Sequence, residues 1–464
     1  MTGTGRGTRI LSWVAVVPPL VIAVLVLRFG VDVPYWDTWD WLDRHYPADP
    51  GAMSMLRRYW APFNGHRVFL PLLIDRALFD LSAIDIWPRI WLKLLLSVAT
   101  LASLLALARS TLTRVPAWLT ATLAAFAFPL AYWPMWMDPR QFSIHLVVLC
   151  MVTALRVSGS AWPIGARLIV SGMLCGAASV SYAPGMLTWP FVALVLWTRE
   201  ERPPALALAA WALAASALVL LHGHDVSLEG SVATTIAPAL DAWLSGTLVV
   251  AGLPASLPVP VVPNVPAILM GGLGLVALAA CASWAWRGIA AEWRRAIPWV
   301  ALGAWAAAYA VMVGATRGGQ PLGALRDPRF AYLAAQLWIA IAVLLAQVRN
   351  SSTQGAPGIS HARATAVGLA IVVAGLAMGC VRPWLARNGT GGLSRQLATG
   401  RNCLLQYASA DRACLALLHP APERVRAIAA RLDARGAAFL RTDNERGHSQ
   451  AEQRNAVGQR ERRP

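Results

Sequence analysis

The chain has 464 residues, of which 57% are hydrophobic and only 14% are charged. Soluble domains carry about 25% charged residues, so this composition excludes an ordinary soluble enzyme and indicates a multi-spanning membrane protein. The formal net charge is +17, and the basic residues are distributed over short connecting segments and the C-terminal end. They form no basic face interleaved with aromatic residues, so nucleic acid is not an expected partner; the charge fits membrane topology and anionic lipid.

The first apolar run, residues 10–29, follows Arg6 and Arg9. It is too long for the hydrophobic region of a signal peptide and no small-residue cleavage site follows it, so we expect an uncleaved first span. Ten further apolar stretches give an all-α polytopic membrane protein with about eleven transmembrane helices. They cover residues 88–108, 117–135, 142–157, 168–182, 184–197, 205–221, 266–286, 297–315, 330–348 and 364–381. The pair 168–182 and 184–197 can alternatively form one broken helix.

The distribution of arginine predicts the orientation. Alternate connections between the spans contain two or three arginines and few acids, whereas the other connections hold most of the acidic residues. An excess of basic residues in short loops marks the cytoplasmic side. We therefore expect a cytoplasmic N-terminus and an extracytoplasmic C-terminus.

Three long segments are expected on the outer side of a transmembrane domain that covers residues 1–381. Residues 30–87 contain short helical apolar bursts with charges between them, a pattern typical of interfacial helices. Residues 222–265 are rich in proline around Pro254 and Pro258, which indicates a loop that dips against the membrane. Residues 382–441 form a small helical extracytoplasmic tail, with a linker at 388–392 and amphipathic helices at 393–418 and 422–440. Residues 442–464 are polar and expected to be disordered.

Two of the six cysteines, Cys403 and Cys414, fall in this tail. An extracytoplasmic location and a short separation permit a disulfide between them, although sequence alone does not give their distance. The other four cysteines lie in predicted spans and are expected to be packing residues.

Two carboxylates, Asp37 and Asp40, follow the first span in an aromatic setting of Trp36, Trp39 and Trp41. Residues three apart share a helix face. A carboxylate desolvated at a membrane boundary can take a proton from a hydroxyl, or the pair can share a divalent cation. The structural alternative is an aromatic belt with acids at a helix start.

Three other outer segments carry groups suited to a phosphate or a sugar. In each case a purely structural role, as a polar turn, a short loop or an internal ion pair, is the alternative. The first segment is a turn in the same loop as the two aspartates, and the second follows the third span. The third segment precedes the tenth span. Its arginines are unexpected there, because the charge distribution predicts few basic residues on the outer side. The candidate residues are Asn64, His66 and Arg67, then Asp138, Arg140 and Gln141, then Arg317, Arg326 and Arg329.

These motifs, in this order, resemble the C-type glycosyltransferases, which are membrane enzymes that use polyprenyl-phosphate sugars. The resemblance rests on the Asp-rich aromatic motif, Asn-x-His-Arg at 64–67, the Trp and Gln of the corner at 133–141, Pro-Gly-Met-Leu-Thr-Trp-Pro at 184–190, and the outer Arg-Gly and Arg-Phe before the late span. It covers roughly the first 440 residues in layout. Two departures stand out: related chains typically have Glu where Gly65 stands, and often Ser-Arg-Tyr where Pro328-Arg329-Phe330 stands.

The resemblance implies that Asp37 or Asp40 is the catalytic base or lies beside it, and that Arg317, Arg326 or Arg329 holds the lipid phosphate. The expected activity is sugar transfer from a polyprenyl-phosphate donor to an envelope glycan or glycolipid on the outer face of a bacterial inner membrane. No nucleotide cofactor is expected. The alternative is a non-enzymatic lipid or polysaccharide transporter, or an accessory subunit of an envelope complex. Transporters place ionisable residues at mid-span, whereas the charges here gather at the outer rim.

Overall fold

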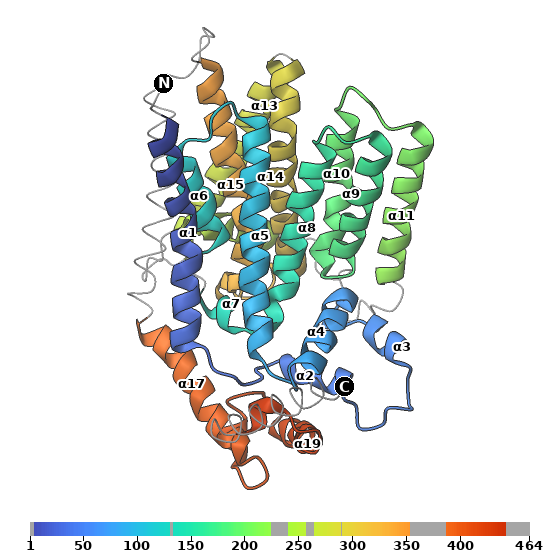
Figure 1. Cartoon of the computed structure of the whole chain (residues 1–464), viewed down its shortest axis with the longest axis vertical. Helices are drawn as coiled ribbons and strands as arrows, with labels where there is room; N and C mark the ends of the chain where they lie inside the picture. Colours follow the sequence, from blue (N-terminus) through green and yellow to red (C-terminus); the bar gives the residue numbers. More distant parts are fainter. Residues whose placement is uncertain are drawn as a thin grey trace, which may run out of the picture.

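The computed structural model describes residues 4–129, 133–223, 240–256, 264–288, 290–352 and 387–441. Every regular element in these ranges is helical. Long helices run side by side in a bundle, and the shorter helices α2, α3, α4, α17 and α19 gather at one end of it (Figure 1). We call this end the loop end. The expected span at 364–381 and the expected disordered segment 442–464 lie outside the described residues.

The bundle contains long and short helices. The α-helices are α1 (Thr4–Phe29), α5 (Trp87–Thr111), α6 (Ala117–Ala127), α7 (Trp133–Met137), α8 (Phe142–Ser158), α9 (Ile164–Ser179), α10 (Thr188–Trp197), α11 (Ala205–Gly223), α12 (Leu240–Gly252), α13 (Val265–Arg287), α14 (Ala290–Arg317) and α15 (Pro328–Ser352). At the loop end are α2 (Thr38–His45), α3 (Met55–Trp60), α4 (Phe69–Leu81), α17 (Arg387–Leu405), α18 (Arg412–Leu415) and α19 (Pro422–Asp433). Short 3-10 turns are η2 (Pro139–Gln141), η3 (Ala183–Leu187), η4 (Leu253–Ala255), η5 (Leu322–Arg326) and η6 (Ala438–Leu440).

Within the described residues, six helical segments are long and apolar enough to cross a membrane. They are Trp87–Thr111, Pro139–Ser158, Ala205–His222, Val265–Arg287, Ala290–Arg317 and Pro328–Asn350. Five shorter apolar helices, Ala15–Phe29, Ala117–Ala127, Ile164–Ser179, Ala183–Trp197 and Leu240–Ala255, accompany them. The structure therefore agrees with a helical membrane protein, whereas the expected number of about eleven spans is not established by it.

The expected continuous span at 117–135 is wrong. Helix α6 ends at Ala127, and α7 is a separate short helix. Phe128, at the end of α6, has φ −126° and ψ 64°, outside the helical region. Proline at position 129 supplies no N–H to a continuing helix and disfavours the helical conformation of the residue before it.

The expected outer loop at 222–265 is also wrong in part, because residues 240–255 form α12 and η4, an apolar helical segment packed against α13 and α14. Glycine allows the close approach: a Cβ at Gly252 would lie 1.8 Å from the carbonyl oxygen of Ala267. Residues 257–263, which contain the second part of the proline cluster, lie outside the described residues.

Residues 168–197 form two packed helices, α9 and α10, and not one broken helix. The two lie side by side in Figure 1 and contact each other. The chain turns between them through η3, where a Cβ at Gly185 would lie 1.9 Å from the carbonyl oxygen of Ala178. Sequence reasoning left both alternatives open because the two apolar runs are short.

A buried charge cluster fixes the loop end to the bundle. Asp75 of α4 forms an ion pair with Arg89 of α5, with a Nε–Oδ1 distance of 2.5 Å, and both side chains are fully buried. His45 of α2 donates from Nε2 to the other oxygen of Asp75 at 2.8 Å, and its Nδ1 lies 2.6 Å from the Tyr59 hydroxyl. Burial lowers the pKa of His45, although Asp75 opposes the shift, so the neutral imidazole is favoured. One carboxylate thus joins α2, α4 and α5.

We expect Asp75→Ala to lower the free energy of unfolding by about 3–5 kcal/mol, because it leaves a buried guanidinium without its partner. The measurement is denaturant unfolding of the detergent-solubilised protein, followed by tryptophan fluorescence. Asp80→Ala is the matched control on the same helix. Asp80 is 53% exposed and pairs with Arg76 at i, i+4, so its loss should cost about 0.5 kcal/mol. Equal effects of the two substitutions would contradict the assigned role of the buried cluster.

Candidate functional site

A cavity of about 580 Å³ opens at the loop end. Its wall is built from segments that are far apart in the sequence. The lining residues are Tyr35, Trp36, Asp37, Trp41, Phe63, Asn64, His66, Val68, Met135, Met137, Asp138, Arg140, Gln141, Ser143, Ile144, Tyr182, Arg317, Asp327, Pro328, Arg329, Leu393 and Leu397. We call it the loop-end cavity. Eight of the eleven candidate binding or catalytic residues therefore meet at one place.

Asp37 lies in this wall immediately before α2. Its Oδ2 accepts a hydrogen bond from Asn64 Nδ2 at 3.0 Å and forms an ion pair with Arg140. Trp36, the preceding residue, has a positive φ of 49°, which is uncommon for a bulky residue. The local backbone and two partners from other segments thus fix the direction of this carboxylate.

The corner before α8 supplies another part of the wall. Asp138 accepts from Arg140 Nε at 3.0 Å and from Gln141 Nε2 at 3.0 Å. Burial raises the pKa of Asp138, but the charge and hydrogen bonds of Arg140, the charge of Lys93 and the hydrogen bond from Gln141 together outweigh burial and lower the pKa to about 2. Lys93 of α5 donates from Nζ to the carbonyl oxygens of Met135, at 2.8 Å, and Trp136, at 2.7 Å. The lysine thus holds the chain that carries Arg140.

Arg140 connects these two parts of the wall, because it pairs with both Asp37 and Asp138. A guanidinium presents five donors in a planar fork, so it can hold two carboxylates at once. The two acids would otherwise repel each other across the cavity.

Two further arginines reach the cavity from α14 and α15. Arg329 lies 3.0 Å from Asp327, measured from Nε to Oδ2. Arg317 stacks over the ring of Phe330 at 5.5 Å. Within the described ranges, no acid lies within ion-pair distance of Arg317. Its positive charge therefore faces the cavity without a described counterion.

His66 lines the cavity from a tight turn. Asn64 and Gly65 both have positive φ, 47° and 74°, and the backbones of Phe63 and His66 are bonded across them. Asn-Gly is the preferred pair in a two-residue turn of this kind. The His66 ring lies 4.4 Å from that of Tyr182. Burial, helped by Arg317 and Arg329, lowers the pKa of His66 to about 4, so the imidazole is neutral near pH 7.

The turn also explains the glycine at position 65. A Cβ at Gly65 would meet no atom within 4 Å, so space is not the constraint. The constraint is the positive φ at position 65, because residues other than glycine and asparagine seldom adopt it. The position points to a backbone role in this chain.

Three candidates lie outside the cavity lining. Arg67 is buried, and its guanidinium donates to the carbonyl oxygens of Trp60 and Leu221, so it holds α3 and α11 together. Arg326 donates to Asn264 Oδ1 at 3.0 Å. Asp40 is paired with Arg424. Each of these three residues is close in the sequence to a residue that lines the cavity. A helix or turn nevertheless directs neighbouring side chains to different faces.

Asp37 and Asp40 have different cationic partners, Arg140 and Arg424. In the described part of the chain, no group of three or more His, Cys, Asp or Glu residues is placed to hold a metal ion.

The structure adds lining residues that sequence reasoning missed. Tyr182, at the turn before η3, contacts His66 with its ring tilted by 54°. Asp327 pairs with Arg329. Leu393 and Leu397 come from the tail helix α17. The Arg-Asp-Pro-Arg sequence signals Asp327, whereas no local pattern reveals that a tail leucine reaches this cavity.

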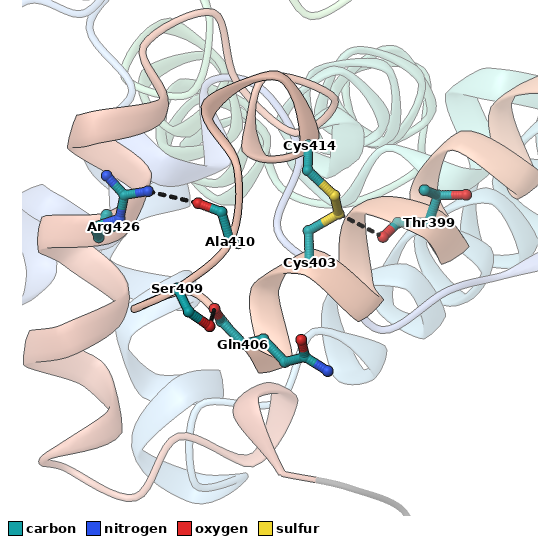
Figure 2. Close-up of a disulfide and its surroundings, with 7 residues drawn as sticks. All are labelled: Thr399, Cys403, Gln406, Ser409, Ala410, Cys414 and Arg426. Atoms are coloured by element: carbon teal, nitrogen blue, oxygen red, sulfur yellow. Dashed lines mark hydrogen bonds between the residues drawn. A yellow bond between two sulfur atoms is a disulfide. The ribbon is translucent and has the colours of Figure 1, made fainter.

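The tail is helical, as expected, but its first helix begins at Arg387 and includes the expected linker at 388–392. Cys403 and Cys414 form a disulfide with a Cα–Cα distance of 5.9 Å (Figure 2). Close by, Arg426 of α19 donates to the carbonyl oxygen of Ala410 at 2.7 Å. These bonds tie α17, the following turn and α19 into one unit.

This unit docks on the segment that carries Asp37. The carbonyl oxygen of Leu418 accepts from the Trp36 N–H at 2.8 Å, directly beside Asp37. Arg424 pairs with Asp40 and Asp43, and Arg431 pairs with Asp43. Burial raises the pKa of Asp40, while Arg424 opposes the rise. Asp40 is therefore an anchor for the tail, and the tail is part of the structure around Asp37.

The chain matches no protein-family model, no curated protein and no solved structure. Its function must therefore be inferred from the site itself.

We expect the double substitution Arg424→Ala, Arg431→Ala to loosen the tail. Part-exposed ion pairs contribute about 0.2–1 kcal/mol each, so amide hydrogen exchange within 422–433 should become several-fold faster. Mass spectrometry of peptides from the labelled protein measures this exchange. Arg412→Ala is the control, because Arg412 pairs with Glu423 inside the tail and not with α2. Unchanged exchange in the double variant would show that these pairs do not hold the tail.

Proposed function

We propose that the protein transfers a sugar from a polyprenyl-phosphate donor to an acceptor hydroxyl of an envelope glycan or glycolipid. The reaction takes place in the loop-end cavity, on the outer face of a bacterial inner membrane, with the N-terminus in the cytoplasm. The observation that carries the proposal is the placement of Asp37, Arg317 and Arg329 in one cavity at the ends of long apolar helices.

Asp37 is the proton acceptor in this proposal. A base must reach the proton that it removes, and Asp37 lines the cavity whereas Asp40 does not. The acceptor oxygen attacks the anomeric carbon, and its proton passes to the Asp37 carboxylate. The bond between the anomeric carbon and the phosphate oxygen breaks, and polyprenyl phosphate leaves with the electron pair. Asn64 and Arg140 keep the carboxylate directed at the acceptor.

Arg317 and Arg329 bind the phosphate. Hydrogen bonds from guanidinium to phosphate are charge-assisted, and they strengthen as negative charge grows on the leaving group. Arg317 is suited to this role because no described acid neutralises it. Neutral His66 and Gln141 are suited to sugar hydroxyls, to which imidazole and amide groups donate or from which they accept.

The lipid part of the donor needs an apolar path. Met135, Met137, Leu393 and Leu397 form an apolar part of the lining. Helices α14 and α15, which carry the phosphate-binding arginines, are long enough to cross a membrane. A donor whose phosphate sits at the helix ends can therefore keep its polyprenyl chain in the bilayer.

We expect Asp37→Asn to lower sugar transfer by about 10²–10⁴-fold, the usual contribution of a positioned base. The assay presents polyprenyl-phosphate mannose and polyprenyl-phosphate glucose to the purified protein in vesicles containing envelope glycolipid, and measures released polyprenyl phosphate. The amide keeps the shape of the carboxylate but cannot accept the proton.

Asp40→Asn is the matched control, because Asp40 lies nearby but anchors the tail outside the cavity. It should retain activity within roughly tenfold of the parent, since it loses only a part-exposed ion pair. Unfolding curves of both variants exclude a general loss of structure. Full activity of Asp37→Asn would refute the assignment of the base.

A further inference from the structure

A second cavity, of about 260 Å³, lies at the opposite end of the bundle. It is bounded by the last turn of α5, the first turns of α14 and the connection after α10. Its lining residues are Leu107, Ser110, Thr111, Gly159, Arg199, Ala291, Arg294, Arg295 and Pro298. Arg294 and Arg317 are on the same helix, and 23 residues at about 1.5 Å each put them roughly 35 Å apart. The two cavities are therefore separate sites.

Three guanidinium groups meet in this second cavity, and no acid is among the lining residues. Arg294 pairs at 2.9 Å with Glu200, whose side chain is 76% exposed. Arg199 donates to the carbonyl oxygen of Gly159, while its Nε is buried without a hydrogen-bond partner. Among the described residues, no acid lies within ion-pair distance of Arg295.

The surroundings of Arg199 disfavour its charged form. Burial lowers the pKa of Arg199, and the like charges of Arg167 and Arg294 lower it further. Arg167 itself forms an ion pair with Glu201 at 2.7 Å. Like charges brought together in a partly desolvated place are unfavourable unless an anion joins them. The cavity is thus complementary to an anion, and none of its described lining residues is an acid.

We propose that this second cavity binds the phosphate headgroup of an anionic phospholipid. Arginine forks match phosphate oxygens in pairs, and basic pockets between transmembrane helices are known to bind such headgroups. A lipid is favoured over free phosphate because the cavity lies where two long apolar helices end and because Leu107 and Pro298 give it an apolar wall. The inference does not depend on the proposed sugar transfer.

The test compares the full-length protein with Arg294→Ala, Arg295→Ala in neutral detergent. Native mass spectrometry counts bound phosphatidylglycerol, with phosphatidylcholine as the zwitterionic reference. The parent should bind at least one phosphatidylglycerol, and the double variant should bind it roughly tenfold more weakly. Phosphatidylcholine binding should be equal in both proteins.

The matched control is Arg109→Ala, Arg114→Ala, which removes the same charge from exposed positions at the same end of the bundle. This control should bind phosphatidylglycerol like the parent. An equal loss in both double variants would mean a general attraction to positive surface and would overturn the site. Displacement of the lipid by millimolar inorganic phosphate would overturn the choice of lipid over free phosphate.

Unfolding curves without lipid check that the double variant is folded. If the double variant is unfolded, the single variant Arg295→Ala is tested in its place, because Arg295 has no ion pair among the described residues. Retention of full phosphatidylglycerol affinity by this single variant would also overturn the proposal.

Discussion

Charged side chains among apolar helices must find partners inside the protein, because neither lipid nor a packed core can solvate them. Each buried charge at the loop end therefore fixes several segments at once. Asp75 joins α2, α4 and α5, and Lys93 holds the carbonyl groups of the corner before α8. Arg140 then links that corner to Asp37. The position of the candidate site follows from this chain of satisfied charges.

The same constraint explains why the site lies at an end of the bundle. Arg317 and Arg329 sit at the facing ends of α14 and α15, where a positive charge can meet water or an anionic headgroup. The tail completes the cavity wall with Leu393 and Leu397, and the Leu418 carbonyl accepts a hydrogen bond from the Trp36 N–H. The cavity wall therefore combines polar and apolar side chains, as the proposed lipid-linked sugar donor would require.

Sequence reasoning predicted the apolar helices, because long apolar runs have few other structures, and it identified most of the polar residues that line the cavity. The sequence-based predictions were wrong where proline or close packing determined the ends of the helices. Pro129 divided one expected span, and small residues such as Gly252 let α12 pack where a loop was expected. The sequence also did not show that Asp37 and His66 line the cavity whereas Asp40 and Arg67 do not. Sequence spacing does not reveal which residues another segment covers. The contribution of α17 could not be foreseen, since it depends on a contact between the two ends of the chain.

The proposed function requires the loop-end cavity to bind a lipid phosphate beside Asp37. An experimental structure of the full-length protein with polyprenyl phosphate in a lipid nanodisc tests it most directly. We expect the phosphate within hydrogen-bond distance of Arg317 or Arg329, with the lipid chain along Leu393 and Leu397. Density for the phosphate only at Arg199, Arg294 and Arg295, with an empty loop-end cavity, would contradict the account.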